Sequence, residues 1–332
     1  MIIMSLQRQF KFSETHGLLH AYCGAMLRTS TFLTRFIKHS PSHYKRFGVV
    51  ALRVHSMARH FKILGKEDLA PSVKRLVALA PLIAEKAQAG QFVVLRVDEK
   101  GERFPLTLVD WDRDKGTVTL IFQEVGVSTR KLGKLEVGDC IKDIVGPLGI
   151  PTGIENLGHV VVIGGGVGAA LIYPWVRALK KRGNHVVTIL GARTAELLLL
   201  EQELRELSDE LHISTDDGSS GIKGFTSDIL MNLLGKGRKF DLVMAAGPVP
   251  MMRAVAEATR PHRMKTIVSL NPIMVDGTGM CGGCRVAVGS EIKFACVDGP
   301  EFDAHQVDFK ELMNRLRTYQ EEEARATQLL DN

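Results

Sequence analysis

Residues 159–183 read HVVVIGGGVGAALIYPWVRALKKRG, and this stretch decides the fold class. It begins with an apolar run, continues through a glycine turn, and ends with apolar residues at helical spacing. A buried strand, a tight turn and an amphipathic helix in this order open a β–α–β unit of a parallel sheet. The pattern G-x-G-x-x-A falls at Gly164, Gly166 and Ala169, where amides at a helix start can hold a pyrophosphate.

Strand-like and helical segments continue to alternate downstream. HVVTILGAR, LHISTDDG, FDLVMAAGP and TIVSLN predict short buried strands, and residues 195–211 predict one long helix. The alternation indicates a doubly wound nucleotide-binding domain. Arg193 stands where an acidic residue often contacts the ribose, and it suits either a 2′-phosphate or a solvated loop, so NAD and NADP both stay open. Gly247 and Pro248 follow a later strand at the same carboxyl edge.

The residues before this unit have a different pattern. Between residues 58 and 150, short segments such as QFVVLRV, TVTLIF and CIKDIVGPLG are separated by turn formers, which indicates a small antiparallel barrel. The turn-rich stretch PTGIENLG then marks a domain junction. We therefore predict a barrel at residues 57–155, a nucleotide-binding domain at 156–270, and a small cysteine-containing segment with a C-terminal helix at 271–332.

Three of the five cysteines lie in MVDGTGMCGGCRVAVGSEIKFACVDG, residues 274–299. Cys281 and Cys284 form C-x2-C, and Cys296 follows after eleven residues. The plant-type [2Fe–2S] pattern places another cysteine five positions before the C-x2-C pair, and Asp276 stands there in this chain. A carboxylate binds iron through oxygen and keeps the charge of a thiolate. We therefore interpret Asp276 as the fourth ligand of a [2Fe–2S] cluster.

The spacing of the cysteines leaves other interpretations open. A zinc site could combine the three cysteines with Asp276 or His305. The cysteines could also be purely structural, and Asp276 could be a turn residue beside an open iron site. Cys23 and Cys140 lack neighbours of this kind, and we interpret them as ordinary residues.

Composition and charge narrow the class of protein. The 332 residues are 45% hydrophobic and 24% charged, as in an ordinary globular protein, and no apolar run approaches the ~20 residues that cross a bilayer. Five cysteines are too few for a secreted disulfide framework, so a cytoplasmic location is the default expectation. Residues 1–56 contain eight Lys or Arg and one acid, and therefore carry +7 against a net charge of +6 for the whole chain.

The remaining residues are close to neutral, and nothing in them suggests a nucleic-acid surface. We interpret residues 1–56 as a basic N-terminal extension that is either poorly ordered or a mis-called start. A transit peptide is the other interpretation that this composition allows.

From about residue 58 to 325, the chain resembles the ferredoxin–NADP reductase superfamily. The resemblance rests on GQFVVLR, GERFPLT, GPLG, GGGVGAA, TDDGSSGIKG, SLNPIMVDGTGMCGGCR and FACVDGPEFDAHQVDF. It is strongest to the branch with a C-terminal [2Fe–2S] domain. That branch includes the dihydroorotate dehydrogenase electron-transfer subunit and the alpha subunit of the NADH-dependent ferredoxin–NADP oxidoreductase, whose relatives are described as sulfide dehydrogenase beta subunits. The aspartate at position 276 resembles the cluster motif of the alpha subunit, whereas the dihydroorotate branch has a cysteine at this position.

The resemblance implies roles for residues that are weak evidence by themselves. In the barrel, Leu106 would lie against the isoalloxazine of FAD, Thr107 would bond near its N5, and Arg103 would face its pyrophosphate from one position earlier than usual. A second flavin segment would wrap the pyrophosphate at a helix start, through Gly126, Ser128 and Thr129. The residues that would frame NAD(H) or NADP(H) are Gly164, Gly165, Gly166, Gly168, Arg193, Asp217, Gly247 and Pro248. The cluster ligands would be Asp276, Cys281, Cys284 and Cys296.

The activity implied by the resemblance is conversion of two-electron into one-electron transfer. A hydride would pass between the nicotinamide and FAD, and single electrons would pass through the cluster, without a catalytic acid or base. The partner would be a larger flavoprotein iron–sulfur subunit in a heterodimer that also uses ferredoxin, as in an electron-bifurcating transhydrogenase. The alternatives are an electron-transfer subunit of a sulfide or dihydroorotate dehydrogenase and, from another class, a zinc-stabilised nucleotide-sensing module.

Overall fold

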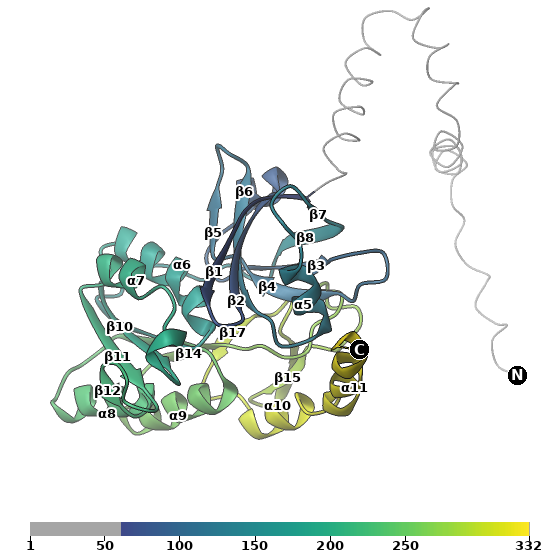
Figure 1. Cartoon of the computed structure of the whole chain (residues 1–332). Coiled ribbons are helices and arrows are strands. Elements are labelled where there is room, and N and C mark those ends of the chain that lie inside the picture. The colour runs from purple at the N-terminus through teal and green to yellow at the C-terminus, as the bar shows by residue number, and fades with distance from the viewer. Residues whose placement is uncertain (1–60, 332) are drawn as a thin grey trace, which may run out of the picture. The chain divides into compact units, whose positions relative to one another are not determined.

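The computed structural model describes residues 61–331, so the interpretation of residues 1–56 falls outside the described part of the chain. Two antiparallel sheets form the N-terminal lobe (Figure 1). The larger has the order β5-β6-β2-β1-β7, with bounds Asp110–Asp112, Thr117–Gln123, Val73–Leu79, Phe61–Ala70 and Cys140–Ile141. The smaller has the order β4-β3-β8, with bounds Phe104–Thr107, Phe92–Arg96 and Asp143–Leu148. Helices α4 (Pro81–Lys86) and α5 (Val127–Gly133) complete this lobe. All strand pairs in the two sheets are antiparallel, which confirms the prediction of an antiparallel domain.

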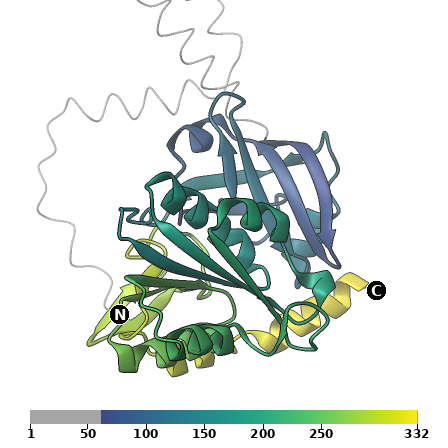
Figure 2. The same cartoon turned by 90° about the vertical axis from the view of Figure 1, so that its left-hand side faces the viewer.

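A seven-stranded sheet forms the second layer (Figures 1 and 2). Its order is β12-β11-β10-β9-β13-β14-β17, with bounds Ile222–Lys223, Glu210–Thr215, His185–Ala192, His159–Gly165, Leu242–Ala246, Thr266–Ser269 and Glu301–Asp303. All pairs are parallel except β14 with β17. One face packs against α6 (Gly168–Lys181) and α7 (Glu201–Leu207). The other packs against α8 (Thr226–Gly235), α9 (Val249–Thr259) and α10 (Phe309–Arg315), so the doubly wound prediction is confirmed.

Strand β9 explains why its sequence is an unbroken apolar run. Successive side chains of a strand point to opposite faces of the sheet. Val161 and Ile163 pack with the α8–α9 core, whereas Val160 and Val162 pack with the α6 core. Both faces are covered by helices, and therefore a polar side chain at a buried position of this central strand would need a hydrogen-bond partner that the apolar core does not offer.

The prediction of one helix over residues 195–211 is wrong. A short 3-10 turn covers Ala195–Leu197, α7 covers only Glu201–Leu207, and β11 begins at Glu210. Between the two helical pieces, Leu200 has a φ of +56°. Leu199 and Leu200 are 3% and 8% exposed in the α6 core, so burial of leucine side chains overrides the helical pattern of the sequence.

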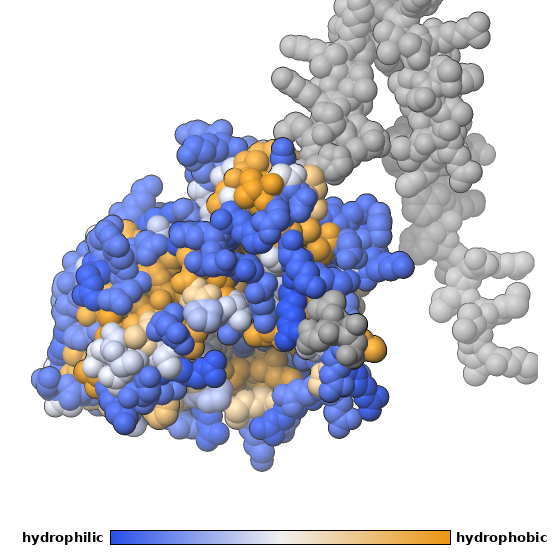
Figure 3. Space-filling view, viewed as in Figure 1, coloured by the Kyte–Doolittle hydropathy of each residue, from blue (hydrophilic) through white to orange (hydrophobic). Residues whose placement is uncertain are grey.

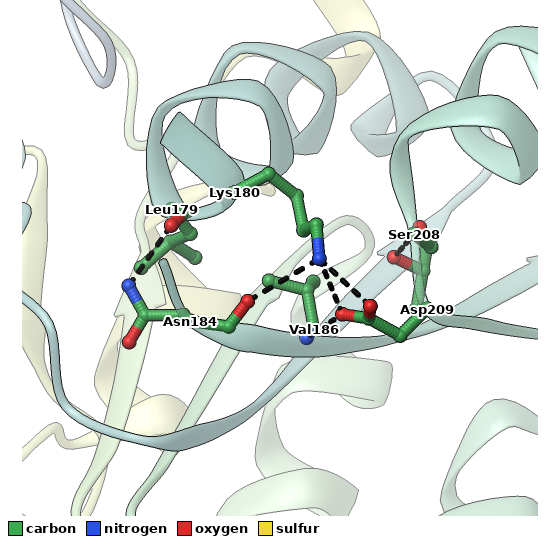
Figure 4. Close-up of polar contacts among 7 residues, drawn as sticks. Leu179, Lys180, Asn184, Val186, Ser208 and Asp209 are labelled. Carbon is green, nitrogen blue, oxygen red and sulfur yellow. Dashed lines mark hydrogen bonds and ion pairs between the residues drawn. The ribbon is translucent and has the colours of Figure 1, made fainter. Parts of the chain in front are cut away.

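Polar contacts tie the end of α6 to β10 and β11 (Figure 4). Lys180 Nζ donates to both oxygens of Asp209 at 2.8 and 2.7 Å, and the amide of Val186 donates to the same carboxylate at 2.7 Å. Asn184 Nδ2 donates to the carbonyl oxygen of Leu179 at 3.0 Å and closes the helix end. Although burial opposes it, the bonds from Lys180 and Val186 hold the pKa of Asp209 below its usual range.

The cysteine segment is not a separate layer. Its hairpin of β15 (Arg285–Val288) and β16 (Glu291–Phe294) is followed by β17, which joins the edge of the parallel sheet. A second helix after α10, α11 (Gln320–Asp331), lies beside α5. The predicted domain boundaries at residues 155 and 270 stay predictions.

Candidate functional site

A cavity of about 880 Å³ has walls from all three predicted segments. The antiparallel lobe contributes Phe92, Leu106, Thr107 and Gln123. The parallel sheet contributes Gly165, Gly166, Gly168, Arg193, Asp216, Thr226, Gly247 and Pro248. The start of the cysteine segment contributes Asn271, Pro272 and Met274. On the face in Figure 3, apolar side chains gather in the middle of the molecule and polar side chains surround them.

The glycine turn lines one end of the cavity with backbone that carries no side chains. Gly166 has a φ of +55°, which favours glycine, and its amide donates to the carbonyl oxygen of Gly191 at 2.9 Å. A Cβ on Gly168 would lie 2.2 Å from the carbonyl oxygen of Ala246, so only glycine lets α6 start this close to β13. Gly164 lies behind the wall, where a Cβ would meet the side chain of Ile172.

The strand ends beyond the turn carry the polar groups of the cavity. Arg193 follows β10 and lines the cavity, and its contact with a nucleotide stays a prediction. Asp216, which follows β11, also lines it. Asp217 instead accepts bonds from the amide and hydroxyl of Ser219 at 2.9 and 2.6 Å, and it stands apart from the wall. Thr226 is 4% exposed, and within residues 61–331 its Oγ1 has no hydrogen-bond partner.

The predicted flavin residues divide into two groups. Leu106 and Thr107 on β4 line the cavity, whereas Arg103 is exposed just before that strand. Gly126, Ser128 and Thr129 lie at the start of α5, apart from the cavity wall. Thr129 Oγ1 accepts bonds from the amides of Val125 and Gly126, both at 3.1 Å, and so closes this helix start.

A buried carboxyl group stands behind the cavity wall, where the segments meet. Trp175 Nε1 donates to Glu301 Oε1 at 2.9 Å, and the hydroxyl of Thr152 donates to the same oxygen. A Cβ on Gly90, which lines the cavity, would overlap this oxygen. Burial raises the pKa of Glu301 to about 7, although both hydrogen bonds act in the opposite direction.

The hairpin β15–β16 brings two of the cysteines together. Cys284 immediately precedes β15, and one residue, Ala295, separates Cys296 from the end of β16. The amide of Ala295 donates to the carbonyl oxygen of Cys284 at 3.1 Å. The two sulfur atoms are 3.2 Å apart, and both residues are 1% exposed. Burial and the neighbouring thiol of Cys284 raise the pKa of Cys296 to about 12. Two thiolates at this separation would repel each other unless a cation lay between them.

The other two predicted ligands lie on the exposed loop before the hairpin. Asp276 accepts bonds from the amides of Thr278 and Cys281, both at 2.9 Å, and these bonds lower the pKa of Asp276. The amide of Gly283 points to the sulfur of Cys281 at 3.4 Å. A Cβ on Gly277 would touch Val94 and Leu148, so the loop lies against β3 and β8.

The residues present fit the groups that the sequence implies. Three thiols and one carboxylate within one loop and hairpin are a donor set for a [2Fe–2S] cluster. Within residues 61–331, no three His, Cys, Asp or Glu side chains converge on one point as a single metal ion would need. A binuclear cluster distributes its four ligands over two irons, so it does not require such a point. The unpartnered Thr226 Oγ1 and the bare glycine turn likewise fit a bound dinucleotide.

Sequence reasoning missed Asp216, Thr226, Asn271 and Glu301. Asp216 is the neighbour of Asp217, which was predicted to contact the nucleotide. Its place at the end of the predicted strand was the only sequence feature that pointed to it. Thr226 and Asn271 follow no motif that reasoning from a single sequence could use. The role of Glu301 depends on Trp175 and Thr152, which are more than 100 residues away along the chain.

Comparison with protein families assigns two parts of the chain. Residues 162–257 match the oxidoreductase NAD-binding domain, and residues 271–308 match the iron–sulfur cluster binding domain of dihydroorotate dehydrogenase B. The first range contains the glycine turn, Arg193 and Gly247. The second contains Asp276 and the three clustered cysteines.

Individual relatives extend over most of the described chain. A dihydroorotate dehydrogenase B (NAD(+)) electron transfer subunit homolog from Thermotoga maritima is 48% identical over 79% of this chain and 92% of its own length. The electron transfer subunit from Bacillus caldolyticus is 34% identical over 74% of this chain and 99% of its own. A solved structure from work on flavin-based electron bifurcation, of an NADH-dependent reduced ferredoxin-NADP oxidoreductase, is 45% identical with a TM-score of 0.78, over 83% of this chain and 98% of that one.

The fold and the site define an NAD(P)H-dependent oxidoreductase subunit of the ferredoxin–NADP reductase superfamily, with an antiparallel flavin lobe, a parallel nucleotide-binding sheet and an iron–sulfur segment. Within that class, the chain belongs to the family of dihydroorotate dehydrogenase B electron-transfer subunits. Membership implies FAD, an iron–sulfur cluster and NAD(P)H as cofactors. None of the helices among the described residues has the length and apolar character that crossing a membrane requires.

Proposed function

We propose that the chain is the alpha subunit of an NADH-dependent ferredoxin–NADP oxidoreductase. It takes electrons from NAD(P)H and delivers them singly to a larger flavoprotein iron–sulfur subunit, in a complex that also uses ferredoxin. The observation that carries the proposal is one cavity of about 880 Å³ whose walls come from the antiparallel lobe, the parallel sheet and the cysteine segment. The 45% identity to the bifurcating oxidoreductase over 98% of that chain supports the choice of complex.

The chain's own residues would hold the two nucleotides face to face. Leu106 and Thr107 would form the flavin side of the cavity, and the amides of the glycine turn would hold the dinucleotide pyrophosphate at the start of α6. Gly247 and Pro248 would close the nicotinamide end at the carboxyl edge of β13. The apolar cavity wall would exclude water, which protects electron transfer from side reactions.

The ligands proposed for the cluster are Asp276, Cys281, Cys284 and Cys296. Met274 lines the cavity and Asp276 follows two residues later, so the loop begins at the wall of the nucleotide site. When bound, FAD accepts two electrons together and releases them one at a time, which an iron–sulfur cluster requires of its donor. The proposed order is therefore nucleotide, flavin, cluster and partner.

The first test is the visible spectrum of the anaerobically purified full-length protein, with flavin and iron counted per chain. One FAD and two irons are expected. A colourless protein with one zinc would refute the proposal and favour the interpretation as a zinc-stabilised nucleotide-sensing module. In a Cys281→Ala protein, NAD(P)H-dependent dye reduction should persist while partner-dependent activity is lost. Full partner activity without the cluster would contradict the proposed order.

The second candidate is the electron-transfer subunit of a dihydroorotate dehydrogenase. The match of residues 271–308 and the 34% identity to the Bacillus caldolyticus subunit favour it. Asp276 favours the first candidate, because the resemblance implies a cysteine at this position in the dihydroorotate branch. Purification of the chain with its native partner separates the two: a flavoprotein iron–sulfur subunit supports the first, and a dihydroorotate-oxidising subunit supports the second.

A further inference from the structure

Two arginine side chains donate hydrogen bonds to the turn between Cys281 and Cys284. Arg285 Nη1 donates to the carbonyl oxygen of Gly282 at 3.1 Å. Arg315 Nη2 donates to the carbonyl oxygen of Gly283, also at 3.1 Å. These carbonyl groups belong to consecutive peptide units, so the arginines fix the orientation of the whole C-x2-C turn.

The orientation of a carbonyl also determines where the next amide points. In a trans peptide the C=O and the following N–H lie on opposite sides. The carbonyl of Gly282 faces Arg285, and the amide of Gly283 accordingly points to the sulfur of Cys281 at 3.4 Å. By the same geometry, the contact of Arg315 with the carbonyl group of Gly283 turns the amide of Cys284 away from the guanidinium.

Arg315 reaches the turn from helix α10, which lies beyond the matched iron–sulfur domain of residues 271–308. The helix is firmly placed, because Leu312 is fully buried in the core that also contains the two buried cysteines. Asp308 caps its start by accepting from the amide of Glu311 at 2.9 Å. Glu311 in turn accepts from the amide of Ala287 on β15 at 3.3 Å. Arg315 is therefore held against the turn by a helix with its own anchors.

The charges near the turn differ in how strongly solvent screens them. A guanidinium stays protonated at any ordinary pH. The side chain of Arg315 is 25% exposed, and Glu311 Oε1 lies 3.9 Å from its Nε and offsets part of its charge. Arg285 is exposed, so water screens it more. Positive charge and N–H donors near cluster sulfurs both stabilise the reduced cluster, which carries one more electron.

We propose that Arg315, assisted by Arg285, is a positioning residue that raises the reduction potential of the [2Fe–2S] cluster by fixing the amides of the C-x2-C turn. The inference rests on the cluster site proposed above. It assigns a redox role to α10, a helix that carries none of the proposed ligands. The two arginines act through the turn and are not themselves ligands.

The test is a reductive titration of the cluster, followed by electron paramagnetic resonance, on the full-length protein and its variants. Arg315→Gln removes the charge and the guanidinium contact, and it should make reduction of the cluster about tenfold less favourable, which is a downward shift of about 59 mV for one electron. Arg285→Gln should lower the potential less, because this side chain is exposed. Arg317→Gln is the matched control, since it removes an exposed positive charge two residues away and should leave the potential unchanged.

Iron content, flavin content and melting temperature are measured on each variant. Wild-type potentials in both Arg315→Gln and Arg285→Gln, with two irons bound, would overturn the inference. If Arg315→Gln loses its iron, the reduction potential of Arg285→Gln tests the inference instead, because this exposed side chain can be removed without opening the core. A wild-type potential in that variant would then overturn the inference. A wild-type protein that binds no two-iron cluster would instead refute the proposed function, so the two failures are distinguishable.

Discussion

The nucleotide cavity and the cysteine loop are built by different means. The cavity is shaped by backbone: strand ends, a bare glycine turn and the close start of α6. The loop is shaped by side chains, of which Cys284 and Cys296 already meet while Asp276 faces backbone amides. A site made of backbone is damaged by added atoms, whereas a site made of ligands is damaged by lost ones. The two sites should therefore fail separately.

The largest effect is expected from Cys284→Ser, which removes a buried proposed ligand from the loop. A serine hydroxyl stays protonated near neutral pH and is a much weaker iron ligand than a thiolate, so the cluster should be lost and partner-dependent electron transfer should fall at least about a hundredfold. Dye reduction by NAD(P)H should stay within about twofold, because the cavity is untouched. Iron content and the two activities are the measurements. Cys140→Ser, at an exposed free cysteine, is the control.

The opposite kind of change is Gly168→Ala, which adds one carbon atom to the cavity wall and leaves the proposed cluster ligands intact. The added Cβ would lie 2.2 Å from a backbone oxygen of β13, and a strand cannot yield as a side chain can. We expect a loss of about 3 kcal/mol in the free energy of unfolding and weaker NAD(P)H binding, with the iron content unchanged. Denaturant unfolding and nucleotide titration measure both. Gly153→Ala, where a Cβ meets nothing within 4 Å, should change neither quantity.

Glu301 lies behind the wall of the nucleotide cavity, and its effect on stability should depend on pH. Its pKa in the folded protein is about 7, above the ordinary 4.5, so the folded state binds the proton more tightly than the unfolded state. The free energy of unfolding should fall by at most about 3 kcal/mol as the pH rises from about 4.5 to about 7, and stay level above that.

Glu301→Gln keeps both hydrogen bonds to the side-chain oxygen and removes the charge. The variant should match the wild type near pH 4.5 and be more stable than it at pH 8. The measurement is the difference in unfolding free energy between the two proteins across this range. A difference that does not change with pH would show that Glu301 does not titrate between these values.

The smallest effect is expected from Thr226→Val in the cavity. Its hydroxyl has no partner among the described residues, so its loss should not reduce stability, but it should weaken nucleotide binding by about 1 kcal/mol, or about fivefold. Thr188→Val provides the opposite case, because the Thr188 hydroxyl is hydrogen-bonded to that of Ser208 at 2.6 Å and neither residue lines the cavity. That variant should lose stability and keep its affinity. Equal affinities in wild type and Thr226→Val would remove Thr226 from the nucleotide site.

The parts of the fold that could be predicted depend on short stretches of chain. The apolar run of β9 indicated a strand buried on both faces, and both faces are covered. Residues 195–211 show the limit of such reasoning. Their leucines and acids have helical spacing, yet burial of Leu199 and Leu200 in the α6 core breaks the helix. Periodicity reports what a segment prefers alone, and it carries no information on which core will take its side chains.

The candidate site shows the same distinction between features set by short stretches of sequence and features set by tertiary packing. The sequence alone determined the glycine turn and the spacing of Cys281, Cys284 and Cys296, because these features depend on residues close together in the chain. Only the tertiary structure decided which groups support them. Arg315 holds a turn more than 30 residues away, and Glu301 meets Trp175 at a junction of separate segments. Such contacts depend on how the lobes pack, and packing follows from the burial of all three cores together.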